Sequence, residues 1–224
     1  MTATFSITKA NGFSKYISLE GITYTGHWKD EKQHGFGEEN SPDGSHYEGE
    51  YFLGKKNGKG KFKWPDGYLY EGEFFNNDMH GYGTYRWKDG RIYQGQWHHN
   101  KMNGNGIFVW PDKKKYIGSY KNDNKHGYGI FNWPDGRKYE GCWSDGKQHG
   151  YGILLNNNSD GKKYGEWKEG KKVRLIKEED DEEIRKVVQD INKQKNEYNF
   201  HEIEKFIFST DKTYKNSNTN DNFE

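Results

Sequence analysis

Aromatic and polar positions recur along this chain with a period of 23 residues. In each period a tyrosine is followed two residues later by a glycine and four residues later by an aromatic residue, as in Tyr47, Gly49 and Tyr51. The opening residues of the six periods are Tyr24, Tyr47, Tyr70, Tyr93, Tyr116 and Tyr139. A spacing of two residues places side chains on one face of a β-strand. The first half of every period is therefore predicted to be a strand.

The second half of each period predicts another strand and a turn. It opens with a glycine pair such as Gly58 and Gly60 and continues with alternating aromatic residues such as Phe62 and Trp64. The Pro-Asp-Gly sequence at 65–67 predicts a tight turn after this strand. Each period is thus one β-hairpin, and since an isolated hairpin is marginal in water, neighbouring units must stack edge to edge. A Cβ atom added at the strand glycines is expected to collide with a neighbouring ring or backbone.

Alternation along the strands separates two faces of the predicted sheet. The face that carries the opening tyrosines is called the aromatic face, and the face that carries Glu48 and Lys61 is called the second face. We expect most rings of the aromatic face to stack between repeats as core and the exposed ones to bind a partner. The candidate partner-binding residues are Tyr47, Tyr51, Trp64, Tyr70, Trp87, Tyr93, Trp97, Trp110, Tyr116, Trp133, Tyr139 and Trp143. The second face turns apolar toward the C-terminus, and its predicted patch consists of Ile107, Val109, Ile117, Ile130, Ile153 and Leu155.

The order Tyr-Glu-Gly at 47–49, a short polar loop and Gly-Lys-Gly at 58–60 resembles the MORN (membrane occupation and recognition nexus) repeat. The resemblance covers about two thirds of the chain. It implies an all-β fold, an elongated and solenoid-like single antiparallel sheet of tandem MORN β-hairpins. At about 10 Å per hairpin, six repeats would span roughly 60 Å. The resemblance also implies a non-catalytic scaffold, similar to MORN-array subunits such as radial spoke head proteins.

Irregular units flank the array, as expected at the ends of a repeat protein. Residues 1–23 hold a degenerate half-repeat, and residues 24–172 hold six full repeats plus a capping half-repeat at 165–171. After Lys172 the chain contains no glycine and no tryptophan, which marks a domain boundary. Residues 213–224 are rich in Asn, Ser and Thr and are predicted to be disordered.

The tail at 173–212 is predicted to form an amphipathic α-helix. Its apolar stripe consists of Ile184, Val187, Val188 and Ile191. An acidic stretch at 178–183 precedes the stripe and suits the positive end of a helix dipole. The stripe docks either on the second face of repeats 4–6 or on another chain, and the sequence leaves both alternatives open. A second short stripe consists of Phe200, Ile203, Phe206 and Ile207.

Charge and composition indicate which kinds of partner and which cellular compartment to expect. The net charge of +1 gives no general attraction to nucleic acid or membrane. Residues 1–172 carry +5 and the tail −4, so that array and tail are electrostatically complementary. The absence of a signal peptide and of an apolar run of about 18 residues, together with a single cysteine, predicts a cytoplasmic, reducing compartment. Within it we expect the cytoskeleton or a cilium, with membrane association as the alternative.

Candidate catalytic and metal chemistry is sparse. The chain has no Gly-x-Ser-x-Gly, P-loop or kinase signature, and Cys142 occupies a strand position that suits packing, so we expect no enzyme and no cofactor. Four histidines precede a glycine in separate repeats: His34, His80, His126 and His149. At about 10 Å per repeat these four cannot converge on one ion, and we expect no metal site. His98 and His99 are interpreted as part of a solvated loop.

The leading functional hypothesis is a protein–protein interaction scaffold in a cytoskeletal, ciliary or axonemal complex, with a homodimer as an open question. The alternative is a peripheral membrane organiser that binds anionic phospholipids such as phosphoinositides through basic loops. The candidate lipid contacts are Lys55, Lys56, Lys113, Lys114 and Lys115. We expect no nucleic-acid binding, because the charge of the array is small and no RNA-binding signature occurs.

Overall fold

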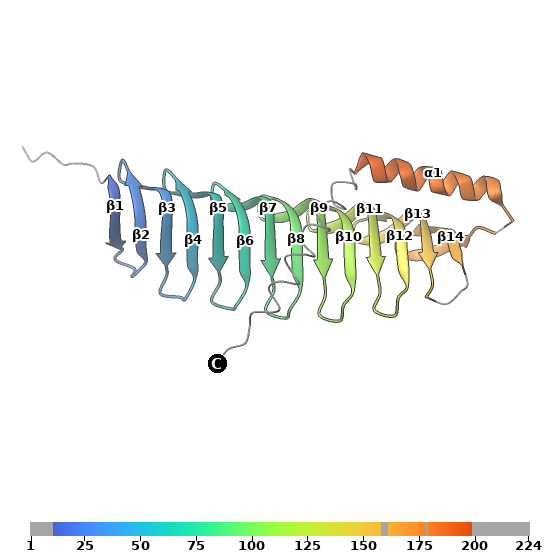
Figure 1. Ribbon diagram of the computed structural model, residues 1–224, viewed down its shortest axis with the longest axis horizontal. Helices are drawn as coiled ribbons and strands as arrows, with labels where there is room; N and C mark the ends of the chain where they lie inside the picture. The colour runs from blue at the N-terminus through green and yellow to red at the C-terminus, as the bar shows by residue number, and fades with distance from the viewer. Residues whose placement is uncertain (1–10, 158–160, 178, 199–224) are drawn as a thin grey trace, which may run out of the picture. The chain divides into compact units, whose positions relative to one another are not determined.

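The 23-residue period becomes a regular series of antiparallel strands (Figure 1). The computed structural model describes residues 11–157, 161–177 and 179–198. The strands are β1 Gly12–Ile17, β2 Thr23–Lys29, β3 Lys32–Asn40, β4 His46–Phe52, β5 Lys55–Lys63, β6 Leu69–Phe75, β7 Asp78–Arg86, β8 Ile92–His98, β9 Lys101–Val109, β10 Lys115–Lys121, β11 Asn124–Asn132, β12 Lys138–Ser144, β13 Lys147–Leu155, β14 Lys162–Lys168 and β15 Lys171–Leu175. In the described part of the chain, the helix α1 Asp181–Glu197 follows them. The predicted fold class, an open single antiparallel sheet of hairpin repeats with a C-terminal helix, is confirmed.

The chain divides into two units, residues 1–101 and residues 102–224. The first contains β1 to β8, and the second contains β9 to β15 and α1. The strand β15 crosses the predicted domain boundary at Lys172 and ends at Leu175. The predicted stripe at 200–207 and the predicted disorder at 213–224 lie outside the described residues. Among the described residues, no helix is long and apolar enough to cross a membrane.

Glycine faces glycine across neighbouring strands. Gly49 pairs with Gly60, and the flanking pairs are Tyr47 with Phe62 and Glu48 with Lys61. The register therefore places the rings on one face and the charges on the other, as alternation predicts. Without side chains, the glycine pair leaves a furrow in the aromatic face. The ring of Tyr47 lies over it, and a Cβ on Gly60 would stand 2.5 Å from the Tyr47 hydroxyl oxygen.

The hydroxyl of each opening tyrosine has a fixed acceptor. It donates to the backbone carbonyl three residues further on, as Tyr47 does to Glu50 at 2.9 Å. Tyr93 donates to Gln96 in the same way. The pairing of β4 with β5 shifts register between Gly49 and Tyr51, and such bulges leave backbone groups without a ladder partner. The tyrosine hydroxyl satisfies one of these groups while its ring remains buried.

Within each unit, edge-to-face ring contacts join neighbouring repeats. Tyr47 lies 5.2 Å from Tyr51 of its own repeat and 5.2 Å from Phe74 of the following one, with interplanar angles of 88° and 89°. Tyr139 contacts Trp143 and Trp167 in the same arrangement. Such perpendicular contacts are a favoured geometry for aromatic pairs. The core of the sheet is thus a row of rings along the aromatic face.

The hairpin turns also connect neighbouring repeats. Asn77 donates its backbone N–H to the Lys56 carbonyl at 3.0 Å, and the Lys56 N–H donates to Asn77 Oδ1 at 2.8 Å. Asn100 and Met79 form the same reciprocal pair. Asn77 and Asn100 have positive φ angles of 76° and 64°, a conformation that asparagine tolerates. Adjacent turns are therefore held together by backbone as well as by rings.

Candidate functional site

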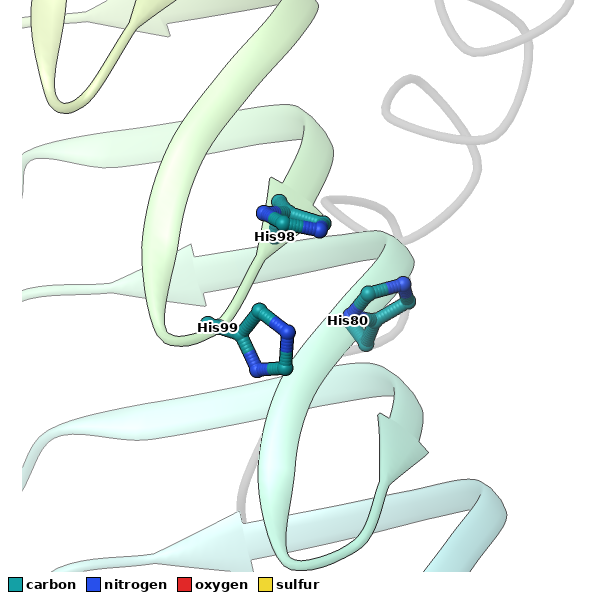
Figure 2. Close-up of side chains that lie close together, drawn as sticks. All are labelled: His80, His98 and His99. Carbon is teal, nitrogen blue, oxygen red and sulfur yellow. The ribbon is translucent and has the colours of Figure 1, made fainter.

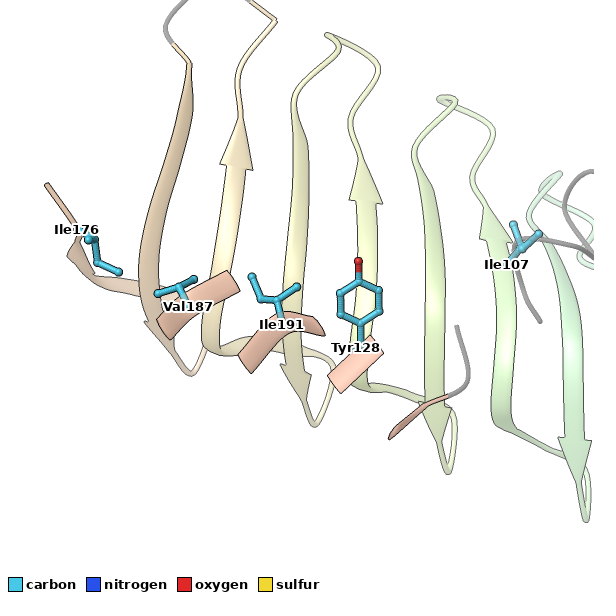
Figure 3. Packing of buried hydrophobic residues seen from close by; sticks show 5 residues of the cluster. All are labelled: Ile107, Tyr128, Ile176, Val187 and Ile191. Atoms are coloured by element: carbon cyan, nitrogen blue, oxygen red, sulfur yellow. The ribbon is translucent and has the colours of Figure 1, made fainter. Parts of the chain in front are cut away.

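The second face of the second unit carries the helix α1 (Figures 1 and 3). Asp180 caps the helix by accepting a hydrogen bond from the Glu183 N–H at 3.0 Å, and Asp181, Glu182 and Glu183 form its acidic first turn. Both features stabilise a helix N-terminus. The helix contacts β11, β12, β13 and β14. Of the two alternatives open from sequence, docking on the array's own second face is the one seen in the structure.

Aliphatic side chains form the centre of this contact. Val187 and Ile191 of the predicted stripe are 0% and 3% exposed, and Tyr128 beneath them is 0% exposed. Ile184 packs against the same cluster, whereas Val188 is only half-buried, at the margin of the stripe. From the predicted second-face patch, the cluster includes Ile107, Val109, Ile117, Ile130 and Ile153. Leu155 is half-buried and lies outside this cluster.

Charged groups surround the aliphatic contact. Glu140 accepts a hydrogen bond from the Tyr128 hydroxyl at 2.5 Å and lies 3.4 Å from Lys195 of the helix. Burial raises the pKa of Glu140, but the hydrogen bond from Tyr128 and the charges of Lys138 and Lys195 together hold it below its usual range. Arg174 pairs with Glu183 at 2.5 Å. These ion pairs do not follow the predicted net charges, because Glu140 is an acidic residue of the array and Lys195 a basic residue of the tail, and Arg174 and Glu183 both belong to the tail.

Cys142 lies under the helix as a packing residue. Its Sγ is 3.9 Å from a carboxylate oxygen of Asp190, and burial raises the pKa of the thiol to about 12. A thiol with a raised pKa stays protonated at neutral pH and is a poor nucleophile. This environment does not suit nucleophilic chemistry.

The second face of the first unit bears aromatic side chains without a covering helix among the described residues. Phe36, Phe52, Phe75 and Tyr82 are 54%, 55%, 46% and 43% exposed. Phe36 and Tyr82 border a groove of about 530 Å³, whose floor and walls include Gly49, Gly60, Glu48 and Lys61. Exposed rings around a groove are typical of interaction surfaces. Sequence reasoning missed this surface, although the second-face positions of these rings follow from alternation.

The aromatic face is mostly closed, which corrects part of the predicted binding surface. Eight of the twelve candidate rings are buried: Tyr47, Tyr51, Tyr70, Tyr93, Trp97, Tyr116, Tyr139 and Trp143. They cannot contact a partner, because they cover the glycine furrows and one another. The other four are half-buried where the second strand of each repeat ends: Trp64, Trp87, Trp110 and Trp133. Only these four leave ring surface for a partner.

Two of the candidate lipid-binding lysines are engaged within the protein. Lys56 pairs with Glu39 at 2.9 Å, and its ammonium group lies 5.0 Å from the centre of the Tyr47 ring. Lys114 pairs with Asp112 at 2.6 Å. Lys56 is therefore corrected from a lipid contact to a structural residue, since its side chain is only 16% exposed.

Lys125 occupies the repeat position of Lys56 without a carboxylate partner among the described residues. Its ammonium group lies 4.7 Å from the ring of Trp143 and 5.1 Å from that of Phe131. Burial lowers the pKa of Lys125 to about 8. A lysine with a lowered folded-state pKa destabilises the protein below that pKa, and the penalty fades as pH rises toward the unfolded value of about 10.4.

Replacing Lys125 by methionine, the residue found at the same repeat position in Met79 and Met102, is therefore expected to stabilise the second unit at pH 7. We expect a gain of about 1 kcal/mol, because cation–π contacts offset part of the desolvation of the charge. The gain should shrink by pH 10. Urea unfolding followed by circular dichroism at both pH values measures it, with exposed Lys121→Met as the control. An equal gain at the two pH values would contradict the assignment of the effect to charge burial.

The histidines before glycine lie in separate repeats, as their spacing predicts, but one of them meets two others. The side-chain nitrogens of His80, His98 and His99 lie within 4.8 Å of one another (Figure 2). His98 and His99 are both exposed, but only His99 lies in a turn, because His98 is the last residue of β8 and not part of the predicted loop. The approach of His98 and His99 to His80 could not be predicted from the repeat spacing, because it depends on the register of adjacent strands and not on equivalent repeat positions.

A one-layer sheet of stacked β-hairpins, with a helix on the second face of one unit and a groove on the second face of the other, defines a β-hairpin repeat protein. The chain matches the MORN repeat at residues 24–46, 47–67, 70–90, 93–115, 116–136 and 139–160, which together exceed half of its 224 residues. It belongs to the MORN repeat family. Repeats of this family are protein- or membrane-binding modules. The comparison with curated proteins found no match.

Several solved structures are similar to this chain at low identity. They include the G-box domain of the microcephaly protein CPAP, with 13% identity, a TM-score of 0.40 and coverage of 74% of this chain and 99% of that one. The TCP domain of Drosophila melanogaster SAS-4, in complex with a proline-rich motif, gives 11%, 0.37, 80% and 97%. The TCP10 domain of Danio rerio CPAP gives 15%, 0.31, 75% and 94%. Likeness at this level says nothing about what the chain binds.

Proposed function

We propose that this chain is a non-catalytic interaction scaffold, and that the second face of its first unit binds an amphipathic helix of a partner protein. One observation carries the proposal. In the second unit, the second face of the same type of repeat binds an amphipathic helix, α1, and Val187 and Ile191 of this helix are buried there. A surface built from equivalent positions is suited to an equivalent ligand.

The equivalence extends to individual residues. The residue between the paired glycines of each repeat points to the second face, and it is Tyr128 beneath α1. In the first unit the same position holds Phe36, Lys59 and Tyr82. Tyr128 is buried by the helix, whereas Phe36 and Tyr82 are exposed. Partner contacts that bury such rings supply much of the binding energy in protein interfaces.

The charges that line the groove indicate which charged residues the partner helix should carry. Glu48 pairs across the sheet with Lys61, and Lys61 with Glu71, so that acidic and basic side chains alternate across the face. The apolar rings lie on either side of them. A matching helix would carry an apolar stripe for the rings and both acidic and basic residues between them, since complementary charges set register and exclude wrong partners.

The setting we propose is a cytoskeletal or ciliary assembly in the cytoplasm, an expectation that rests on the resemblance to MORN-array subunits. The alternative, a membrane organiser that binds anionic phospholipid, has less support, because Lys56 and Lys114 are already paired. Co-sedimentation with anionic and neutral vesicles separates the two. Salt-sensitive binding to anionic vesicles alone would favour the membrane alternative.

Site-specific photo-crosslinking tests the proposed surface. A photoreactive phenylalanine derivative at Phe36 or Tyr82 is expected to crosslink, in cells, to one helix-forming segment of one partner. A peptide of that segment should then bind the purified chain, and Phe36→Glu should weaken this binding at least tenfold, about 1.4 kcal/mol.

The matched control is Leu19, which is fully exposed in the turn after β1 and does not lie on the second face. The photoreactive residue at this position should not crosslink to the segment, and Leu19→Glu should leave the affinity unchanged. Crosslinks only to a second copy of the chain would show that this surface forms a homodimer and does not bind a partner helix. If crosslinking at Phe36 and Tyr82 does not exceed that at Leu19, this surface is not a binding site.

A further inference from the structure

Three imidazoles converge at one end of the first unit's hairpins (Figure 2). His80 belongs to β7, His98 ends β8, and His99 lies in the turn that follows. The ring centres are 5.0 Å apart for His80 and His98, 5.5 Å for His80 and His99, and 4.4 Å for His98 and His99. Each ring offers one nitrogen within 4.8 Å of the others.

The three histidines meet because one repeat has histidine where other repeats have a different residue. The histidine before glycine in one repeat neighbours the residue after the second aromatic of the next repeat, as His34 neighbours Phe52 at 5.4 Å. At the step from the third repeat to the fourth, that neighbour is His98 in place of phenylalanine, and His99 follows. His34 therefore provides a natural comparison in which the repeat geometry is the same and the other two imidazoles are missing.

The turn that carries His99 is fixed to the neighbouring strand. Asn100 donates its N–H to the Met79 carbonyl at 3.0 Å, and the Met79 N–H donates to Asn100 Oδ1 at 2.7 Å. These bonds hold the histidines of the turn beside β7. A site whose ligands are held in place before binding loses less conformational entropy on binding.

An acidic side chain orients one of the imidazoles. Asp78 Oδ2 lies 2.9 Å from His99 Nδ1, and Asn100 Nδ2 donates to Asp78 Oδ1 at 2.5 Å. A carboxylate that accepts from one imidazole nitrogen leaves the other free as a lone-pair donor. This carboxylate–histidine arrangement is the usual outer shell of metal-binding histidines.

We propose that His80, His98 and His99 bind a divalent transition-metal ion, with Zn²⁺ as the first candidate. Neutral imidazole is a preferred ligand of Zn²⁺, and three protein ligands leave a fourth position for water or for a group of a partner. At about 2.1 Å from a tetrahedral ion the nitrogens would stand about 3.4 Å apart, so nitrogens that now lie within 4.8 Å of one another must move closer by up to about 1.4 Å. The exposed side chains of His98 and His99 have the freedom to do so.

Isothermal titration of the full chain, without a histidine tag, with zinc chloride tests the site. We expect one saturable site per chain and a rise in thermal stability with free Zn²⁺. His98→Gln and His99→Gln should each weaken binding at least tenfold. Asp78→Asn should weaken it about 10- to 100-fold, as loss of an outer-shell carboxylate does.

His34→Gln and His126→Gln are the matched controls, because they change the same repeat position as His80 in repeats without the other two imidazoles. Both should leave Zn²⁺ binding unchanged. Circular dichroism and urea unfolding establish that each variant is folded. Binding that persists in the double variant His98→Gln/His99→Gln, or no saturable binding by the original chain, would overturn the proposal.

Discussion

Gly60→Ala is expected to lower the free energy of unfolding of the first unit by about 3 kcal/mol. The new methyl group would lie 2.5 Å from Tyr47 Oη and 2.6 Å from its Cε2 atom, far inside van der Waals contact. The ring cannot withdraw freely, because it packs between Tyr51 and Phe74 and its hydroxyl is bonded to the Glu50 carbonyl. Overpacking of a core costs about 1–3 kcal/mol, and a displaced hydrogen bond about 1 kcal/mol more. Urea unfolding followed by circular dichroism measures the loss.

Two substitutions identify its cause. Lys61→Ala changes the next residue, which is exposed on the second face, and should alter stability by less than about 0.5 kcal/mol. Tyr47→Ala removes the ring over the furrow, so Gly60→Ala should cost much less in that background than in the original chain. If the two costs simply add, the clash with Tyr47 is not the reason for glycine at this position.

The sheet could be predicted because the sequence repeats its local rules without drift. Tyrosine and glycine at a spacing of two fix the strand and its face, and the constant 23-residue period keeps every glycine pair in register, as Gly49 with Gly60 shows. The helix was predictable for a similar reason, since the stripe of Ile184, Val187 and Ile191 has helical spacing behind an acidic start.

The binding surfaces were less predictable because alternation assigns a face but does not say what covers it. The tyrosines bend over their own glycines, so that Tyr47 and Tyr70 are buried in a sheet of one layer. The rings of Phe36 and Tyr82 are exposed because their positions lack such a furrow and no helix lies on them in the described part of the chain. Which apolar face pairs with which element is a tertiary question that periodicity alone does not answer.

The histidine cluster could not be predicted from equivalent repeat positions. Histidines at equivalent positions, such as His34 and His80, lie in separate repeats and are far apart. His80 instead meets His98, 18 residues later in sequence, because adjacent antiparallel strands bring different repeat positions together. The signal was present as the pair His98-His99, which no other repeat has at these two positions, but using it requires the register between repeats.

Val187→Asp is expected to detach α1 from the second face and to lower the stability of the second unit by several kcal/mol. Val187 is fully buried between the helix and the sheet, in the cluster with Ile176 and Ile191. A carboxylate there would be desolvated among aliphatic groups, which costs more than the helix gains by remaining docked. Backbone amides of β11 to β13 should then exchange with deuterium about 100-fold faster, as expected for a loss of about 3 kcal/mol of local stability.

The point substitution tests the helix more cleanly than truncation after Lys172, because truncation would also remove most of β15 at Lys171–Leu175. Gln189→Asp, on the exposed side of α1, adds the same charge without burial and should leave exchange unchanged. Amides of the first unit serve as an internal reference in each sample.

If α1 loses protection in Val187→Asp while β11 to β13 keep theirs, the helix covers a face that is stable without it. In that case the second face of the second unit would itself be available to a partner helix when α1 is released, because Tyr128 would be uncovered at the position that Phe36 and Tyr82 occupy in the first unit.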